Sequence, residues 1–203
     1  MFFLRTLPFF FLGVAGVSAQ TPPSHLPDVE PGYFNASASI LINAPIEKVW
    51  QILLDFPAYP EWNPFARQQV IYDKWFLKPL EDQTAREGLN MIITSQIPPL
   101  EGPVNADTPN NLLNTRYSGE NITHVNTPEP YQVAWKFHPS PDFALSAERW
   151  SALSVFEGQT FYESREVFGG LLAPAVEVTQ ADGLRKGFLA QAKALKDRAE
   201  GLP

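Results

Sequence analysis

The sequence predicts an α+β domain in which one antiparallel sheet of seven strands wraps around a long C-terminal helix. Three observations lead to this prediction: a strand pattern followed by short helices, six further strand patterns separated by turn residues, and a helical pattern that ends the chain. With 203 residues, of which 44% are hydrophobic, the chain can build a sizeable core. A single helix cannot fill the inside of such a sheet completely, so an internal apolar cavity is expected.

The first strand and the first helix follow each other directly. FNASASILIN, residues 34–43, alternates as a strand does, and APIEKVWQILLD then places apolar residues on one helical face. Pro45 suits the first turn of this helix, and Pro57 ends it. The aromatic stretch FPAYPEWNPF is expected to turn between two short helices and to close one end of the cavity, with Trp50 and Trp62 in packing roles.

The rest of the sheet is predicted from six runs of strand-forming residues. They span about 66–76, 88–97, 112–125, 131–138, 148–156 and 160–168. One long irregular segment, 97–111, is typical of a loop that covers a site.

The C-terminal helix is the longest predicted element, with about 25 residues. Its apolar face consists of Leu184, Phe188, Ala192, Leu195 and Ala199. Gly183 and Gly187 lie inside it, although each costs about 1 kcal/mol relative to alanine. Four residues apart, they leave one flank of the helix bare, either for close packing, which is favoured, or for room beside a cavity.

Residues 1–19 are predicted to be a cleaved signal peptide. They contain one basic residue, Arg5, an apolar run over about 7–16, and the small residues VSA at the end. The run is shorter than the roughly 20 apolar residues that a bilayer span needs, so no stable membrane anchor is expected. Residues 20–33 then form an extended leader, and residues 34–203 form a single domain.

Two sequons agree with a signal peptide. Asn35 begins NAS and Asn121 begins NIT, and both fit the acceptor pattern for N-glycosylation. Together these features predict a glycoprotein of the secretory pathway, either secreted or lumenal.

Composition excludes several classes of function. The chain has no cysteine, which rules out thiolate chemistry, and its net charge of −7 disfavours nucleic acid as a partner. The three histidines, His25, His124 and His138, do not have metal-binding spacing, and no nucleotide-binding motif is present, so no metal or cofactor is expected. No sequence feature specifies an oligomeric state.

The order of elements and three segments resemble a known superfamily. SILINAPIEKVWQILLDFPAYPEWNPF at the front, with TFYESREVFGGLLAP and GLRKGFLAQAKALKDRAEG at the back, resemble the SRPBCC superfamily, the START-like helix-grip fold, and its polyketide cyclase/dehydratase type in particular. The resemblance covers about residues 34–200. It implies a seven-stranded sheet around a long helix with an apolar pocket between them. Members of the superfamily include carriers, hormone receptors, cyclases and dehydratases, so the fold alone does not choose a function.

Strand alternation predicts which residues line the pocket, because successive side chains point to opposite faces. In YQVAWKFH the aromatic side chains must face inward, and His138 then faces outward. The expected ligand-binding residues on strands are Tyr131, Trp135, Phe137, Met91, Ile93 and Phe168, and Phe188 on the C-terminal helix is expected to join them.

Three residues are candidate acid–base catalysts. Tyr162 and Glu166 share the inward face of TFYESREVF, where burial would raise the pKa of Glu166; the alternative is that Glu166 forms a buried ion pair with an arginine. Glu163 and Arg165, on the outer face, are expected to form a solvated charge pair. If a glycan on Asn121 points outward, His124 points inward as a candidate base, although a lone histidine is more often a core residue.

Two functions follow from these predictions. The first is a cyclase or dehydratase that folds a polyketide- or terpenoid-like intermediate of secondary metabolism in the pocket and acts on it by acid–base catalysis. The alternative is a secreted carrier of lipids or small aromatic molecules, in which the polar residues only orient the ligand.

Overall fold

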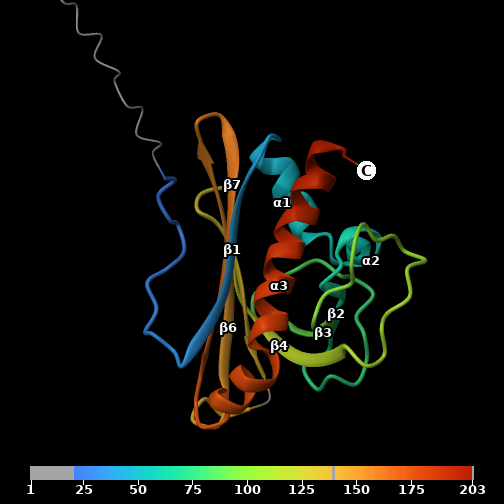
Figure 1. Cartoon of the computed structure of the whole chain (residues 1–203), viewed down its shortest axis with the longest axis vertical. Helices are drawn as coiled ribbons and strands as arrows, with labels where there is room; N and C mark the ends of the chain where they lie inside the picture. The colour runs from blue at the N-terminus through green and yellow to red at the C-terminus, as the bar shows by residue number, and fades with distance from the viewer. Residues whose placement is uncertain (1–20, 139, 203) are drawn as a thin grey trace, which may run out of the picture.

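The computed structural model describes residues 21–138 and 140–202, and it has the predicted α+β architecture (Figure 1). Strand β1 (Phe34–Ile42) leads into helix α1 (Ile46–Leu54), the 3-10 helix η1 (Phe56–Ala58) and helix α2 (Tyr59–Trp62). Six strands and the long helix α3 (Ala173–Glu200) follow. The strands are β2 (Ala66–Tyr72), β3 (Asn90–Gln96), β4 (Thr115–Asn126), β5 (Tyr131–Phe137), β6 (Ser146–Phe156) and β7 (Gln159–Gly169). The predicted signal peptide lies outside the described residues.

All seven strands form one antiparallel sheet in the order β1-β7-β6-β5-β4-β3-β2. The β6–β7 hairpin turns through Glu157 and Gly158, both at positive φ, as a two-residue hairpin turn requires. Irregularities of register interrupt β2 and β4, and such bulges bend a strand and increase its twist. The sheet therefore curves, and α3 lies along its inner face (Figure 1).

Helix α3 confirms the prediction of a long C-terminal helix. Pro174 stands in its first turn, where a missing backbone N–H costs nothing, and Gly201 ends it in the left-handed conformation at φ 71°. The predicted apolar face, from Leu184 to Ala199, is buried. Within the described residues, no helix is long and apolar enough to cross a membrane.

The two glycines of α3 permit close packing, as favoured from the sequence. A Cβ atom on Gly187 would lie 2.4 Å from Cδ2 of Phe65, and a Cβ atom on Gly183 would lie 2.6 Å from Cγ2 of Ile97. The bare flank of the helix is thus occupied by side chains from the segments around β2 and β3.

The long segment after β3 is fastened by one buried arginine. Arg67 is 3% exposed, and its guanidinium donates hydrogen bonds both to oxygens in and just after α2 and to oxygens of the long segment itself. The acceptors are the carbonyls of Pro60, Asn63, Asn105 and Thr108 and the Asn110 side chain. This planar donor pattern connects α2 with the loop, which lysine could not reproduce.

The leader, residues 21–33, crosses the face of the sheet opposite α3 (Figure 1). Glu163 accepts hydrogen bonds from Ser24 Oγ at 2.7 Å and from the His25 backbone N–H at 2.5 Å. Arg165 donates to the Pro27 carbonyl at 2.5 Å. Glu163 and Arg165 therefore do not form the solvated charge pair expected from the sequence; each holds the leader instead.

Replacement of Gly187 by alanine is expected to lower the free energy of unfolding by up to about 2 kcal/mol. The methyl group must displace the Phe65 ring, and such overpacking costs about 1–3 kcal/mol, whereas the gain in helix propensity is about 1 kcal/mol. Urea denaturation of Gly187→Ala measures the difference. The cost should shrink in a Phe65→Leu background, where the ring is gone. A Gly187→Ala variant that is about 1 kcal/mol more stable than the wild type, which is the full gain in helix propensity, would contradict this packing.

Candidate functional site

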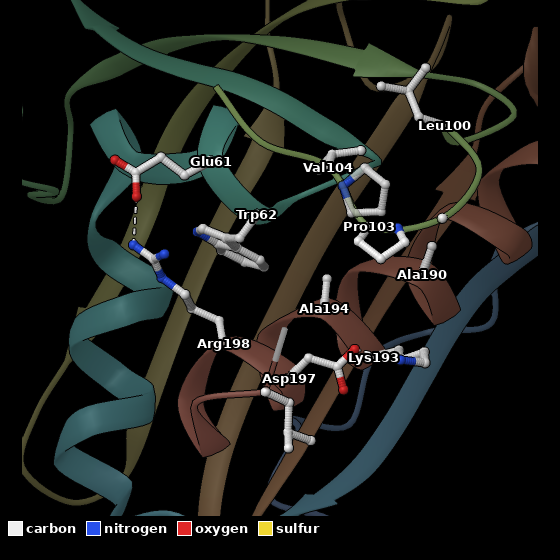
Figure 2. A pocket seen from close by; sticks show the side chains of 13 residues that line it. Glu61, Trp62, Leu100, Pro103, Val104, Ala190, Lys193, Ala194, Asp197 and Arg198 are labelled. Atoms are coloured by element: carbon white, nitrogen blue, oxygen red, sulfur yellow. Dashed lines mark hydrogen bonds and ion pairs between the residues drawn. The ribbon is translucent and has the colours of Figure 1, made fainter. Parts of the chain in front are cut away.

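One hollow beside α3 offers no unpaired charged side chain to a ligand. It measures about 540 Å³ and lies between α2, the loop after β3 and the C-terminal half of α3 (Figure 2). Its charged side chains are already paired: Arg198 donates to Glu61 at 2.6 Å, and Lys193 pairs with Asp197. Paired, solvated charges of this kind have no unmet need for a ligand.

The inner cavity is smaller, about 260 Å³, and lies between the curved sheet and the N-terminal half of α3. Its apolar wall includes Phe65, Ile93, Trp135, Phe137, Phe168 and Leu184. Three ionisable side chains from the middle of the sheet also line it: Glu120, Arg149 and Glu166. The combination of an apolar wall with a few converging polar groups is typical of ligand sites.

Pairing register places the three charged residues on the inner face. Arg149 on β6 lies directly opposite Glu166 on β7, and Glu120 on β4 lies opposite Phe137 on β5. Directly opposed residues of an antiparallel sheet point to the same face. Because Phe137 and Glu166 line the cavity, their partners do as well.

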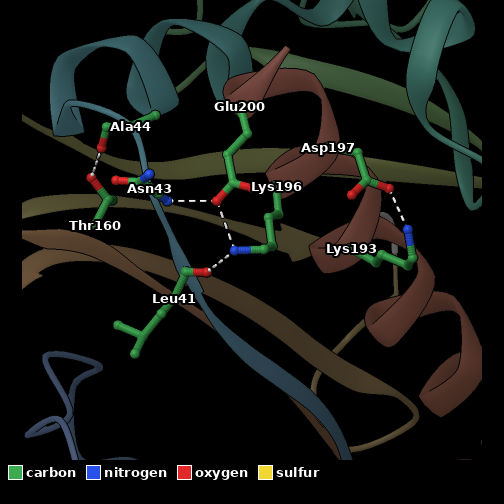
Figure 3. Close-up of polar contacts among 8 residues, drawn as sticks. All are labelled: Leu41, Asn43, Ala44, Thr160, Lys193, Lys196, Asp197 and Glu200. Carbon is green, nitrogen blue, oxygen red and sulfur yellow. Dashed lines mark hydrogen bonds and ion pairs between the residues drawn. The ribbon is translucent and has the colours of Figure 1, made fainter. Parts of the chain in front are cut away.

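Helix α3 forms one wall of the cavity. Polar contacts near the C-terminus of this helix fix its position against β1 (Figure 3). Lys196 donates to the Leu41 carbonyl and to Glu200, both at 2.7 Å, and the backbone N–H of Asn43 donates to the Glu200 carboxylate at 2.6 Å. These contacts lower the pKa of Glu200, with the Lys196 hydrogen bond as the largest cause. The ionised carboxylate thus ties the helix end to the loop after β1.

Arg149 is a buried cation without a carboxylate partner. Its side chain is 4% exposed, and among the described residues it makes no ion pair. The centre of the guanidinium lies 4.1 Å from the Phe188 ring centroid and 5.6 Å from that of Trp135. Cation–π attraction therefore supplies part of what burial takes from its hydration.

A single hydroxyl orients the guanidinium. Arg149 Nε donates to Ser164 Oγ at 3.1 Å, and this hydroxyl itself donates to the Trp150 carbonyl at 3.0 Å. Ser164 is fixed by these contacts, so it holds Arg149 in one position. Nη2 of Arg149 is buried and has no hydrogen-bond partner among the described residues.

The two carboxyl groups are shifted toward their neutral forms. Burial raises the pKa of Glu166 to about 7, although the charge of Arg149 opposes the rise. Glu166 keeps some accessible surface, but that surface lines the cavity. Burial raises the pKa of Glu120 well above its ordinary value, and the nearby charge of Glu166 raises it further. Both carboxyls are biased toward the neutral form, and a pKa of about 7 suits Glu166 to exchange a proton with a ligand near neutral pH.

Glu166 therefore lies where the sequence predicted, in the cavity and without the arginine ion pair that was the alternative. Of the seven residues expected to bind ligand, four line the cavity: Ile93, Trp135, Phe137 and Phe168. Phe188 packs on Arg149, and Tyr131 packs edge-on against Trp50 with ring centroids 5.5 Å apart. Met91 is fully buried in the core.

Tyr162 faces inward, as predicted, but it does not line the cavity. It lies four residues before Glu166 on β7 and is 1% exposed, and its hydroxyl has no partner among the described residues. Burial raises the pKa of Tyr59 above its ordinary value, and nearby Tyr162 adds a smaller contribution to that rise. Tyr162 and Tyr59 are therefore buried in the core, outside the lining of the cavity.

The prediction that His124 faces the cavity is wrong. The register of β4 on β5 steps from Ile122 opposite Trp135 to His124 opposite Ala134, with Thr123 inserted as a bulge. The extra residue reverses the alternation, so His124 lies on the outer face. There its ring packs on Trp150, with centroids 4.5 Å apart.

The two sequon asparagines differ in their surroundings. Asn35 is exposed on β1, the strand at one edge of the sheet. Asn121 also points away from the cavity, opposite Lys136, but its amide donates to Asn90 Oδ1 at 3.1 Å. Glycosylation at both positions stays a prediction.

Sequence reasoning missed Glu120 and Arg149. Glu120 directly precedes Asn121, so if a glycan on Asn121 points outward, alternation places Glu120 inward. Arg149 lies on the same face of its strand as Ser151 and Leu153, which are buried. Both were overlooked because charged residues in strands usually face solvent. Within residues 21–138 and 140–202, no group of three or more His, Asp or Glu side chains is placed to hold a metal ion.

Comparisons with known proteins agree with the fold. A family model described as polyketide cyclase/dehydrase and lipid transport matches residues 33–200. A search of curated proteins finds no significant match.

Solved structures resemble the chain at low sequence identity, so they speak for the fold alone. A hypothetical protein from Helicobacter pylori is 11% identical, with a TM-score of 0.60 over 83% of this chain and 89% of that one. Major latex-like protein 151 from Panax ginseng is 10% identical, with a TM-score of 0.58 over 82% and 97%. A START superfamily protein from Mycobacterium smegmatis is 18% identical, with a TM-score of 0.51 over 83% and 99%.

The buried carboxyl of Glu166 predicts a stability difference that depends on pH. Its pKa in the folded protein is raised above the unfolded value of 4.5, so its contribution to stability is fully present below pH 4.5 and is lost as the pH rises through about 7. Glutamine does not titrate. The stability of Glu166→Gln relative to wild type should therefore improve by about 2–3 kcal/mol between pH 4.5 and pH 8.

Chemical denaturation at the two pH values measures this difference. Glu163→Gln, on the outer face of the same strand, is the matched control for the chemical change. A difference between Glu166→Gln and wild type that does not vary with pH would mean that Glu166 is ordinarily ionised.

Proposed function

Because the chain belongs to the polyketide cyclase/dehydrase and lipid transport family, we propose that it is a cyclase or dehydratase that needs no cofactor. Its substrate would be a hydrophobic polyketide- or terpenoid-like intermediate of secondary metabolism. One observation carries the proposal: the Glu166 carboxyl, with a pKa raised to about 7, lines an apolar cavity beside a second buried carboxyl. A general acid or base works best when its pKa lies near the operating pH.

The two carboxyls suit the proton transfers that these reactions require. Ring closure by aldol addition begins when a base removes a proton from a carbon next to a carbonyl group, and the electron pair of that C–H bond forms an enolate. In our proposal, ionised Glu166 takes this proton. The enolate carbon then bonds to a second carbonyl carbon of the same molecule, and the alkoxide that forms takes a proton from protonated Glu120, which gives an isomer of the substrate. In a loss of water, ionised Glu166 takes a second proton from the same carbon, the electron pair of that C–H bond forms the C=C bond, and protonated Glu120 gives its proton to the departing hydroxyl group, which leaves as water. Proton exchange between the two carboxyls then restores the starting state.

The cavity also restricts the substrate. Its volume of about 260 Å³ lies below the roughly 300–1,000 Å³ of ordinary small-molecule pockets. Contacts with the apolar wall would limit the conformations of a reactive molecule, which can contribute as much as the acid–base groups themselves. We place the reaction in the secretory pathway or outside the cell, on the strength of the predicted signal peptide and sequons.

A carrier without chemistry is the second candidate. The family description includes lipid transport, and neither His124 nor Tyr162 lines the cavity, so fewer catalytic groups surround a ligand than the sequence predicted. In a carrier the same apolar wall would bind a small hydrophobic molecule and release it unchanged.

Conversion of host metabolites separates the two candidates. Protein purified from its own host is incubated with a small-molecule extract of that host, and products are followed by liquid chromatography and mass spectrometry. The enzyme proposal predicts a product that is an isomer of its precursor or lacks one water. Glu166→Gln should slow formation of this product by about 10²–10⁴-fold, whereas Glu163→Gln should not.

Two other results would count against catalysis by Glu166. Recovery of every bound molecule unchanged favours the carrier. A product formed equally fast by Glu166→Gln removes this carboxyl from the mechanism.

A further inference from the structure

We propose that the ligand of the inner cavity is a compact organic anion, in which a carboxylate binds Arg149 and an apolar ring body packs against Trp135, Phe137 and Phe168. The inference rests on the proposed function in one respect only, because it requires that the inner cavity is the ligand site. It holds whether the ligand is converted or carried.

The first argument is that Arg149 is a buried cation that lacks an anionic partner. A buried charge is costly unless it is paired and hydrogen-bonded. Arg149 is 4% exposed, makes no ion pair within the described residues, and has its Nη2 buried without a partner. Its Nε group donates a hydrogen bond to Ser164 Oγ, and the centre of the guanidinium lies 4.1 Å from the ring centroid of Phe188. Nη2 is closed off from the cavity, whereas Nη1 keeps accessible surface and donates no hydrogen bond among the described residues, so Nη1 is the group left for an anion; guanidinium and carboxylate match in charge and geometry.

The neighbouring carboxyls are the second argument. Glu166 lies directly opposite Arg149 in the sheet, yet no oxygen of it comes within ion-pair distance. Burial raises the pKa of both Glu166 and Glu120, which favours the neutral forms that neither neutralise Arg149 nor repel an anion. Arg116, exposed at the edge of the cavity, adds a second positive charge that would attract an anion toward it.

The size and wall of the cavity define the rest of the ligand. Aromatic side chains from β5 and β7 form its sides, and Phe65 lies across from them. Such walls favour flat ring systems, which stack on or pack against aromatic side chains. A volume of about 260 Å³ suits a compact ring system rather than a long acyl chain.

The same binding mode would position a substrate for the proposed chemistry. Arg149 and Glu166 are cross-strand neighbours, so a carboxylate held by the arginine would place the adjacent atoms of the ligand beside the Glu166 carboxyl. Arg149 would then be a binding and positioning residue, and Glu166 the group that exchanges a proton.

The test compares two probes of equal shape and different charge. Binding of 2-naphthoate and of its neutral amide, 2-naphthamide, is measured by calorimetry at pH 6.5 with the wild type and with Arg149→Met, which keeps the apolar stem. The wild type should bind naphthoate at least about tenfold more tightly than naphthamide, as charge-assisted hydrogen bonds imply. Arg149→Met should lose this preference while binding naphthamide as well as the wild type does.

Each remaining outcome is informative. Binding of naphthamide by Arg149→Met shows that the cavity is intact; if that variant does not fold, Arg149→Lys should keep part of the preference. Equal binding of both probes by the wild type, a preference that survives Arg149→Met, or no binding of either probe would overturn the proposal. The readout is binding alone, so it stands even if Glu166→Gln leaves conversion of host metabolites unchanged, and the converse also holds.

Discussion

The structure of the site depends on one physical constraint, the burial of the Arg149 guanidinium among aromatic rings. Phe188 from α3, Trp135 from β5 and Phe65 from the segment before β2 surround it. Each ring is fixed by a different part of the fold. Gly187 lets Phe65 approach the helix, and the polar contacts of Lys196 and Glu200 set where the helix lies on β1.

The aromatic stretch after α1 has a role in this arrangement. Most of its rings, such as those of Tyr59 and Trp62, pack in the core, and only Phe65 reaches the cavity. Asn63 fixes the backbone at Phe65, because its side-chain oxygen accepts hydrogen bonds from the backbone N–H groups of Phe65 and Ala66 at 2.9 and 3.0 Å. Two carboxyls buried beside a cation that they do not pair with reduce stability at neutral pH, a cost that functional sites commonly carry.

Most of the fold could be predicted from the sequence because its periodic signals are strong. Alternation identified the inner face of β5 and β7, and helical spacing identified the buried face of α3. The same rule failed on β4, since the bulge at Thr123 has no glycine or other residue that marks it, and one extra residue reversed His124. Residue type argued against Glu120 and Arg149, because charged side chains in strands usually face solvent; the pairing register then shows that both line the cavity. The contacts of Glu163 and Arg165 with the leader were hidden because they join segments more than a hundred residues apart.

The central claim is that Glu120 and Glu166 share a buried site with an unpaired arginine and resist ionisation. The most direct test is an NMR titration of the side-chain carboxyl carbons of these two residues in the ligand-free protein. The structure predicts that Glu166 titrates with an apparent pKa of about 7 and that Glu120 titrates well above its ordinary value. Titration of both groups near 4.5 would show that they are ionised at neutral pH and that they neutralise Arg149, which would contradict the account of the site.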